Sequence, residues 1–154
     1  MQVLCQPQGI CSWNYELRAE RWQGTAEFNW LREEGELVID GKRYDICKHG
    51  MMSGRWTLET PGMVLCEAIK ENAFSRTVQI KTGETQSTLH AASMFGRSMV
   101  LEHPAGHLTL SPVHAFTRRA IIEGDEAGAE LVGFTFWLTA LTWRRAAQNS
   151  NSAT

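Results

Sequence analysis

Hydrophobic and polar residues alternate in short runs along most of the chain, as expected for β-strands with one buried face. The segment "ELVIDGKRYDI", residues 36–46, holds two such runs on either side of Asp40-Gly41. This pair favours a type I′ hairpin, which needs positive φ at both central residues. The alternation gives the hairpin one dry face, made by Leu37, Ile39, Tyr44 and Ile46.

Turn signals recur after this hairpin, at Pro61-Gly62, Thr82-Gly83 and in "HPAGH", residues 103–107. The runs between such signals predict strands near residues 13–20, 22–31, 35–40, 42–48, 54–60, 63–70, 74–82, 84–92, 97–103, 107–111 and 113–123. This regular spacing indicates a mainly β protein, an antiparallel β-barrel of about 11–12 strands.

The pattern changes near the end of the chain, where residues 131–143 are apolar on every side of a helix. Asp125 and Glu126 suit its N-terminus, and Arg144 and Arg145 suit its C-terminus, so we expect a helix over residues 125–146. A helix that is apolar on every side must be surrounded by other apolar groups, in a protein core or in a membrane. An apolar stretch of about 13 residues is short for a membrane span, which needs about 20. We therefore expect it inside the barrel. A tail anchor and an oligomer-contact helix are the alternatives.

The length of 154 residues fits one domain. We expect this domain over residues 1–147, followed by a disordered Asn/Ser-rich tail, 148–154. The net charge of −2 gives no bulk attraction to nucleic acid. The N-terminal segment has no uninterrupted apolar run of the signal-peptide kind, and four dispersed cysteines form no disulfide or zinc framework. These features favour a cytoplasmic protein with reduced thiols, which is not an integral membrane protein. Cys47 and Cys66 are expected to be buried.

A barrel closed around a hydrophobic C-terminal helix resembles the tubby C-terminal-like superfamily, which includes tubby domains, phospholipid scramblases and LURP-one-related proteins. The likeness covers nearly the whole chain and rests on element order. It also rests on the acidic residues before the helix, Glu123, Asp125 and Glu126. These three acids are fewer than in the acid-rich calcium segment of scramblases, and helix capping explains them.

The resemblance implies a non-enzymatic module that binds anionic lipid head groups or a protein partner. Lys42 and Arg43, at the tip of the first hairpin, are candidate head-group ligands because Lys supplies a point charge and Arg a bidentate fork. A solubilising turn is the alternative reading of the same two residues.

Catalytic and metal-binding signals are sparse. The sequence has no nucleophile elbow, zinc-protease motif or dinucleotide fingerprint, so we expect neither an enzyme nor a cofactor. Cys47 with a distant histidine is a remote nucleophilic pair. His103 and His107 flank a loop and are remote metal candidates, since a three-residue hairpin would place them face to face.

Aromatic residues suggest the alternative function, a β-barrel that binds a small hydrophobic ligand. They are Trp13, Tyr15, Trp22, Phe28, Trp30, Trp56 and Phe95. If the C-terminal helix fills the barrel, the same side chains pack on the helix instead. The two arrangements compete for one interior.

Overall fold

The computed structural model describes residues 1–154 except 11, 30, 51–53, 73–74, 115–116 and 153–154. The described elements are β1 (Gln2–Pro7), β2 (Tyr15–Ala19), β3 (Gln23–Phe28), β4 (Gly35–Ile39), β5 (Lys42–Lys48), β6 (Arg55–Thr60), β7 (Met63–Lys70), β8 (Val78–Thr82), β9 (Thr85–Ala91), β10 (Met99–His103), β11 (Gly106–Pro112), β12 (Ala120–Gly124) and α1 (Ala129–Ser152).

The strands form a closed antiparallel barrel in which each strand pairs with its neighbours in sequence, and β1 closes the barrel against β12. The predicted barrel is confirmed, and each of the eleven predicted segments overlaps one strand. The twelfth strand, β1, was not predicted. Its alternation is clear in the structure, where Val3 and Cys5 are buried and their neighbours are exposed.

The hairpin predicted from Asp40-Gly41 is confirmed. Ile39 pairs with Lys42, and both turn residues have positive φ, 48° for Asp40 and 84° for Gly41. Leu37, Ile39, Tyr44 and Ile46 are buried, as the alternation predicted. Local turn chemistry therefore sets the register of these two strands.

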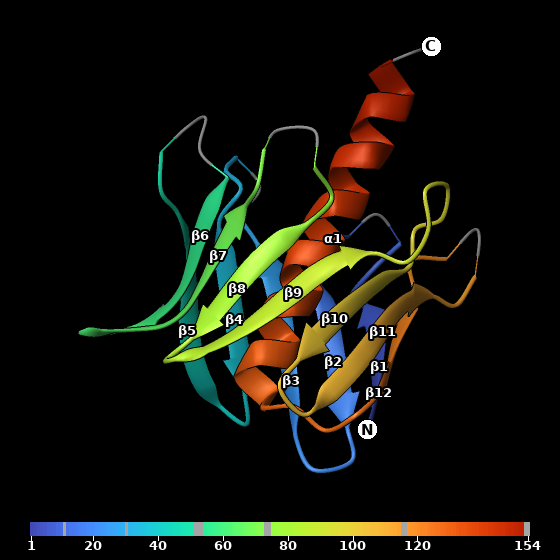
Figure 1. Cartoon of the computed structure of the whole chain (residues 1–154). Helices are drawn as coiled ribbons and strands as arrows, with labels where there is room; N and C mark the ends of the chain where they lie inside the picture. Colours follow the sequence, from blue (N-terminus) through green and yellow to red (C-terminus); the bar gives the residue numbers. More distant parts are fainter. Residues whose placement is uncertain (11, 30, 51–53, 73–74, 115–116, 153–154) are drawn as a thin grey trace.

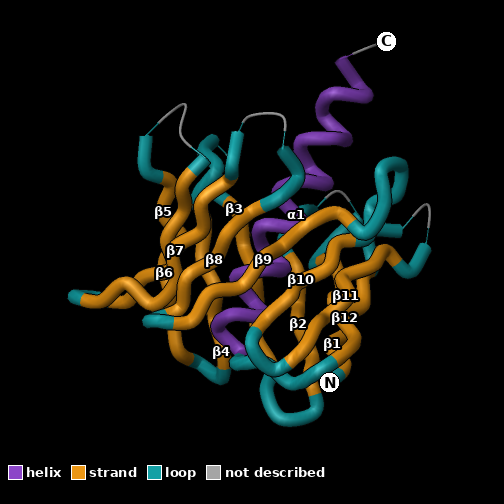
Figure 2. The backbone as a smooth tube through the Cα atoms, viewed as in Figure 1, coloured by secondary structure: helices purple, strands orange, loops and turns teal. Residues whose placement is uncertain are grey.

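The helix α1 runs through the barrel, and the strands surround its first half (Figures 1 and 2). Every residue from 132 to 141 is buried. On one side, the Phe136 ring meets Tyr15 edge to face, with 4.8 Å between ring centroids. On another side, Trp137 stacks on Phe28 at 4.6 Å and donates a hydrogen bond to the Glu27 carbonyl oxygen. An apolar surface on all sides is thus matched by barrel side chains on all sides.

The helix limits differ from the predicted 125–146. The helix begins at Ala129, after the Gly128 carbonyl accepts the first helical bond from the Val132 amide. Asp125 does not cap it. The Asp125 carboxylate instead accepts a hydrogen bond from the His107 amide, where β11 begins and β12 ends.

Residues 148–152, expected in the tail, belong to α1, which continues to Ser152. Residues 153–154 of that tail lie outside the described residues. Arg144 and Arg145 are therefore not in the last helical turn, which has no basic residue. Their side chains point instead to Phe28 and Glu33.

The two ends of the barrel are built differently. Short turns join the strands at one end, and the chain also enters α1 there, where Tyr44 donates a hydrogen bond to Glu130. We call this end the short-turn rim. Longer connections lie at the other end, at residues 8–14, 29–34, 49–54, 71–77, 92–98 and 113–119. The helix leaves the barrel there, as Figure 1 shows, and we call this end the helix-exit rim.

Candidate functional site

A strongly basic concave surface lies on the helix-exit rim, between α1 and two loops. It is an open cleft of about 660 Å³. The β7–β8 side, the β9–β10 loop and the emerging helix line it, through Lys70, Ser75, Arg76, Gly96, Arg97, Thr142, Trp143, Arg145, Ala146, Gln148 and Asn149. We call it the basic cleft, because four of these described lining residues are basic and none is acidic.

Hydrogen bonds from both sides fix the β9–β10 loop against the cleft. Arg76 donates to the Gly96 carbonyl oxygen at 2.9 Å and to that of Ser93 at 3.5 Å. The indole of Trp143, on α1, donates to the Arg97 carbonyl oxygen at 2.8 Å. The loop backbone is therefore tied to a second loop and to the helix. These ties fix the backbone that carries Arg97, whose side chain lines the cleft.

The cations of the cleft differ in their environments. The Arg97 side chain is exposed, and no hydrogen bond or ion pair joins its guanidinium to a described residue. Partial burial lowers the pKa of Lys70, and the nearby Arg145 cation lowers it further. The Glu33 carboxylate offsets part of this repulsion, and a bound anion would relieve the remainder.

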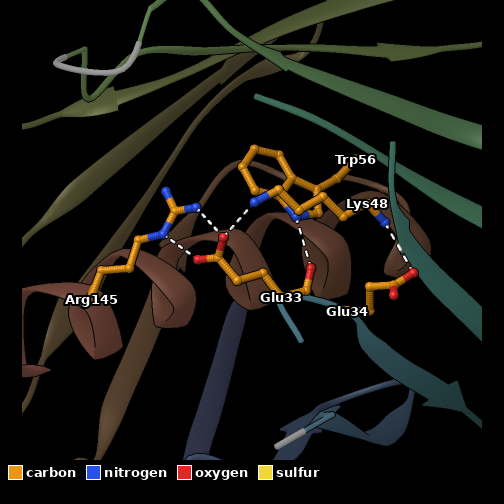
Figure 3. A network of polar contacts seen from close by, with 5 residues as sticks. All are labelled: Glu33, Glu34, Lys48, Trp56 and Arg145. Atoms are coloured by element: carbon orange, nitrogen blue, oxygen red, sulfur yellow. Dashed lines mark hydrogen bonds and ion pairs between the residues drawn. The ribbon is translucent and has the colours of Figure 1, made fainter. Parts of the chain in front are cut away.

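Arg145 also belongs to a network behind the cleft (Figure 3). Its guanidinium makes two hydrogen bonds to the Glu33 carboxylate, and the Lys48 ammonium contacts the same carboxylate at 2.6 Å. The hydrogen bond from Arg145 and, after it, that from Lys48 lower the pKa of Glu33 to about 2.

Trp56 completes this network. Its indole donates to the Glu33 carbonyl oxygen at 3.0 Å, and Lys48 and Arg145 each lie 5.5 Å from its ring centroid. The network thus joins β5, β6 and the β3–β4 loop to the helix where the helix leaves the barrel.

Lys42 and Arg43, the head-group candidates from the sequence, lie on the short-turn rim, far along the barrel from the basic cleft. Arg43 pairs with Glu36, which raises the pKa of Arg43. Lys42 lies 5.3 Å from the Tyr44 ring centroid. The structure therefore separates these two cations from those of the cleft and gives both a neighbour on the barrel wall.

The predicted pairing of His103 with His107 is wrong. The connection is a two-residue turn, so His103 faces Gly106 and His107 faces Glu102. Facing residues share a side of the sheet, which puts the two histidines on opposite sides. His107 instead lies 3.9 Å from the Asp125 carboxylate. Within the described part of the chain, no three His, Cys, Asp or Glu residues are grouped as a metal site requires.

The described cysteines are free thiols: Cys5, Cys47 and Cys66. Cys66 is buried as predicted, whereas Cys47 is only half-buried. Burial and, to a smaller extent, a hydrogen bond with Glu59 raise the pKa of Cys47 to about 12. A thiol with this pKa stays protonated at neutral pH, which disfavours Cys47 as a nucleophile.

The aromatic residues divide into two groups. Tyr15 and Trp56 are buried, and Trp13, Trp22 and Phe28 are partly buried, in agreement with core packing. Phe95 is an exception, because it is almost fully exposed in the β9–β10 loop. Trp30 lies outside the described residues.

The cleft residues were not predicted from the sequence. Lys70, Arg76, Arg97 and Arg145 are dispersed over 76 positions, and only barrel closure and the helix path bring them together. Residues 95–98, "FGRS", form part of the loop that carries Arg97.

No protein-family model, curated protein or solved structure matches this chain. The fold defines it as a closed twelve-stranded antiparallel β-barrel with a C-terminal helix. Across the described residues, no helix combines the length and the apolarity that a bilayer crossing requires.

Proposed function

We propose that the protein is a non-enzymatic binding module that holds a phosphorylated lipid head group in the basic cleft. The observation that carries this proposal is the convergence of Lys70, Arg76, Arg97 and Arg145 on one concave surface without an acidic lining residue among those described. The whole chain has a net charge of −2, so this local excess of positive charge is not a consequence of composition.

The chemistry of the cleft suits a phosphate. An exposed guanidinium such as that of Arg97 can bind a phosphate through two parallel hydrogen bonds, and Lys70 adds a point charge. The side chains of Ser75 and Thr142 supply neutral donors on the same surface. The barrel-and-helix arrangement also agrees with the resemblance to the tubby C-terminal-like superfamily.

The alternative, a barrel that binds a small hydrophobic ligand, needs space inside the barrel. The contacts of Phe136 with Tyr15 and of Trp137 with Phe28 occupy that space, which supports the head-group proposal over the alternative. A hydrophobic ligand that co-purifies in stoichiometric amount would favour the alternative.

Calorimetric titration with a soluble inositol polyphosphate, a head group without acyl chains, tests the proposal. We expect Arg97→Ala to weaken binding by about tenfold, because it removes a charge-assisted hydrogen bond. Added salt should weaken binding to the wild type as well. The Arg97 side chain bonds to no described residue, so this change should leave the stability of the fold intact.

Lys42→Ala/Arg43→Ala is the matched control, and it also tests the site suggested by the sequence. Unchanged affinity in this variant, with a loss in Arg97→Ala, supports the basic cleft. The reverse result places the head group at the hairpin tip and overturns the cleft assignment. No binding to any phosphorylated head group contradicts the proposed function itself.

A further inference from the structure

Exposed apolar side chains gather in the loops of the helix-exit rim. Nine large hydrophobic residues are exposed among those described, and five of them lie in these loops: Ile10, Leu31, Met94, Phe95 and Val113. Met94 and Phe95 stand at adjacent positions, 85% and 95% exposed. Arg97, which lines the basic cleft, follows two residues after Phe95.

The projection of Met94 and Phe95 is built into the fold. The amide of Gly96 donates to the Ser93 hydroxyl at 3.1 Å, which closes a tight turn around the two apolar residues. Arg76 bonds to the carbonyl oxygens on both sides of this turn, at Ser93 and Gly96. These bonds hold the backbone so that both side chains point away from the barrel.

A protein partner is a poor match for this distribution. Protein interfaces have a contiguous apolar core surrounded by polar groups, whereas here the exposed apolar residues lie on four separate loops. A bilayer interface is fluid, so it accepts separate side chains at separate points and adds electrostatic attraction for nearby cations. The basic cleft supplies those cations beside the Met94-Phe95 turn.

We propose that the helix-exit rim docks on the surface of an anionic phospholipid bilayer, with Met94 and Phe95 inserted between the head groups. Arg97 and Lys70 then lie at the level of the lipid phosphates. This inference rests on the proposed function, because the head group held in the cleft belongs to a lipid of that bilayer.

The end of α1 fits this orientation. The helix projects beyond the loops of the rim (Figure 1). The last turns of the helix, residues 146–151, carry amide and hydroxyl side chains but no carboxylate. Because these residues carry no negative charge, they add no repulsion toward anionic lipid.

The test is co-sedimentation with vesicles of phosphatidylcholine containing 30% phosphatidylserine, compared with pure phosphatidylcholine, for the full chain. Met94→Ser/Phe95→Ser should weaken vesicle binding by about tenfold, because burial of two apolar side chains is lost. It should leave the titration with soluble inositol polyphosphate unchanged. Wild type, but not the double variant, should raise the surface pressure of a lipid monolayer.

Met63→Ser/Val64→Ser is the matched control, since both residues are exposed and begin β7 at the short-turn rim. It should bind vesicles like wild type. If Met94→Ser/Phe95→Ser binds vesicles like wild type while Arg97→Ala still weakens the binding of soluble head group, the insertion is wrong and the proposed function stands. If the protein binds neither soluble head groups nor anionic vesicles, the proposed function and the bilayer docking are both wrong. A protein bound through the Met94-Phe95 turn without vesicle binding overturns the bilayer assignment.

Discussion

The carboxylate of Glu33 links the helix α1 to the barrel through ion pairs. It lies in the β3–β4 loop and binds Arg145 of α1 and Lys48 of β5. Its side chain is 30% exposed, so solvent partly screens these ion pairs. Partial burial weakens this screening relative to a fully exposed ion pair, but it also adds a desolvation cost.

We predict that Glu33→Gln lowers the free energy of unfolding at pH 7 by about 1–2 kcal/mol, after allowance for screening. The folded-state pKa of about 2 lies below the ordinary carboxyl value of 4.5, so the carboxylate stabilises the fold above the ordinary value. This advantage over the variant should be complete above pH 4.5 and should disappear as the pH falls toward 2. Urea denaturation across this range measures it.

Glu84→Gln is the control, because Glu84 is exposed in the β8–β9 turn at the other end of the barrel. It should change the stability by less than about 0.5 kcal/mol at any pH. A difference between wild type and Glu33→Gln that stays constant down to pH 2 would contradict the assigned role of the ion pairs.

Gly35 shows a different constraint on a single residue. A Cβ atom there would lie 2.0 Å from the Glu27 carbonyl oxygen and 2.6 Å from the Trp137 indole nitrogen. These two groups form the hydrogen bond that holds Trp137 of α1 against the barrel wall. Glycine is therefore required where the Trp137 indole hydrogen-bonds to the strand backbone.

Among the elements, those with local signals were predictable. Asp40-Gly41 encodes its turn within two residues, and the alternation of residues 36–46 encodes which face is dry. The strand β1 has the same alternation, but no turn signal precedes it to mark its start. The helix limits failed for a different reason: Asp125 had a competing partner, the His107 amide, that only the pairing of β11 with β12 brings near.

The basic cleft could not be predicted at the level of elements. A hairpin tip such as Lys42-Arg43 is visible in the sequence because its residues are adjacent. Arg76 and Arg97 come from different loops, and Arg145 comes from the helix. Their proximity depends on the order of strands around the barrel and on the path of α1, which are long-range properties.

At the element scale we predict that truncating the centre of α1 is strongly destabilising. Phe136 and Trp137 are fully buried on different sides of the helix. Replacement of either by Ala should lower the free energy of unfolding by about 3–5 kcal/mol, as for other large side chains in cores. Guanidinium denaturation followed by circular dichroism measures the loss. Trp137→Ala also leaves the Glu27 carbonyl without its indole donor.

Phe95→Ala is the matched control, since it removes an aromatic ring of the same kind from an exposed loop. Its effect on stability should be below about 0.5 kcal/mol. If Phe136→Ala were as harmless as Phe95→Ala, the helix would not be packed in the barrel in solution.

At the scale of the whole molecule, barrel and helix depend on each other. The inward faces of the strands are apolar, with Leu17, Leu37, Leu58, Ile80, Leu101 and Ile122 all fully buried. Main-chain pairing closes the barrel, but it does not fill it. Without α1 the inward side chains would lose their packing partners, and that loss is large compared with the net stability of a domain.

We therefore predict that a chain ending at Gly124 is unfolded and insoluble, whereas one ending at Ala147 stays folded. The first deletion removes all of α1, including the buried residues 132–141, and the second removes only Gln148 and the residues after it, whose described members are exposed. Circular dichroism and the soluble fraction after lysis compare the two. A soluble, cooperatively unfolding chain that ends at Gly124 would show that the barrel supports itself. The helix would then be free to leave the barrel. Trp143 of the helix holds the Arg97 backbone, so the basic cleft would exist only while the helix is inside.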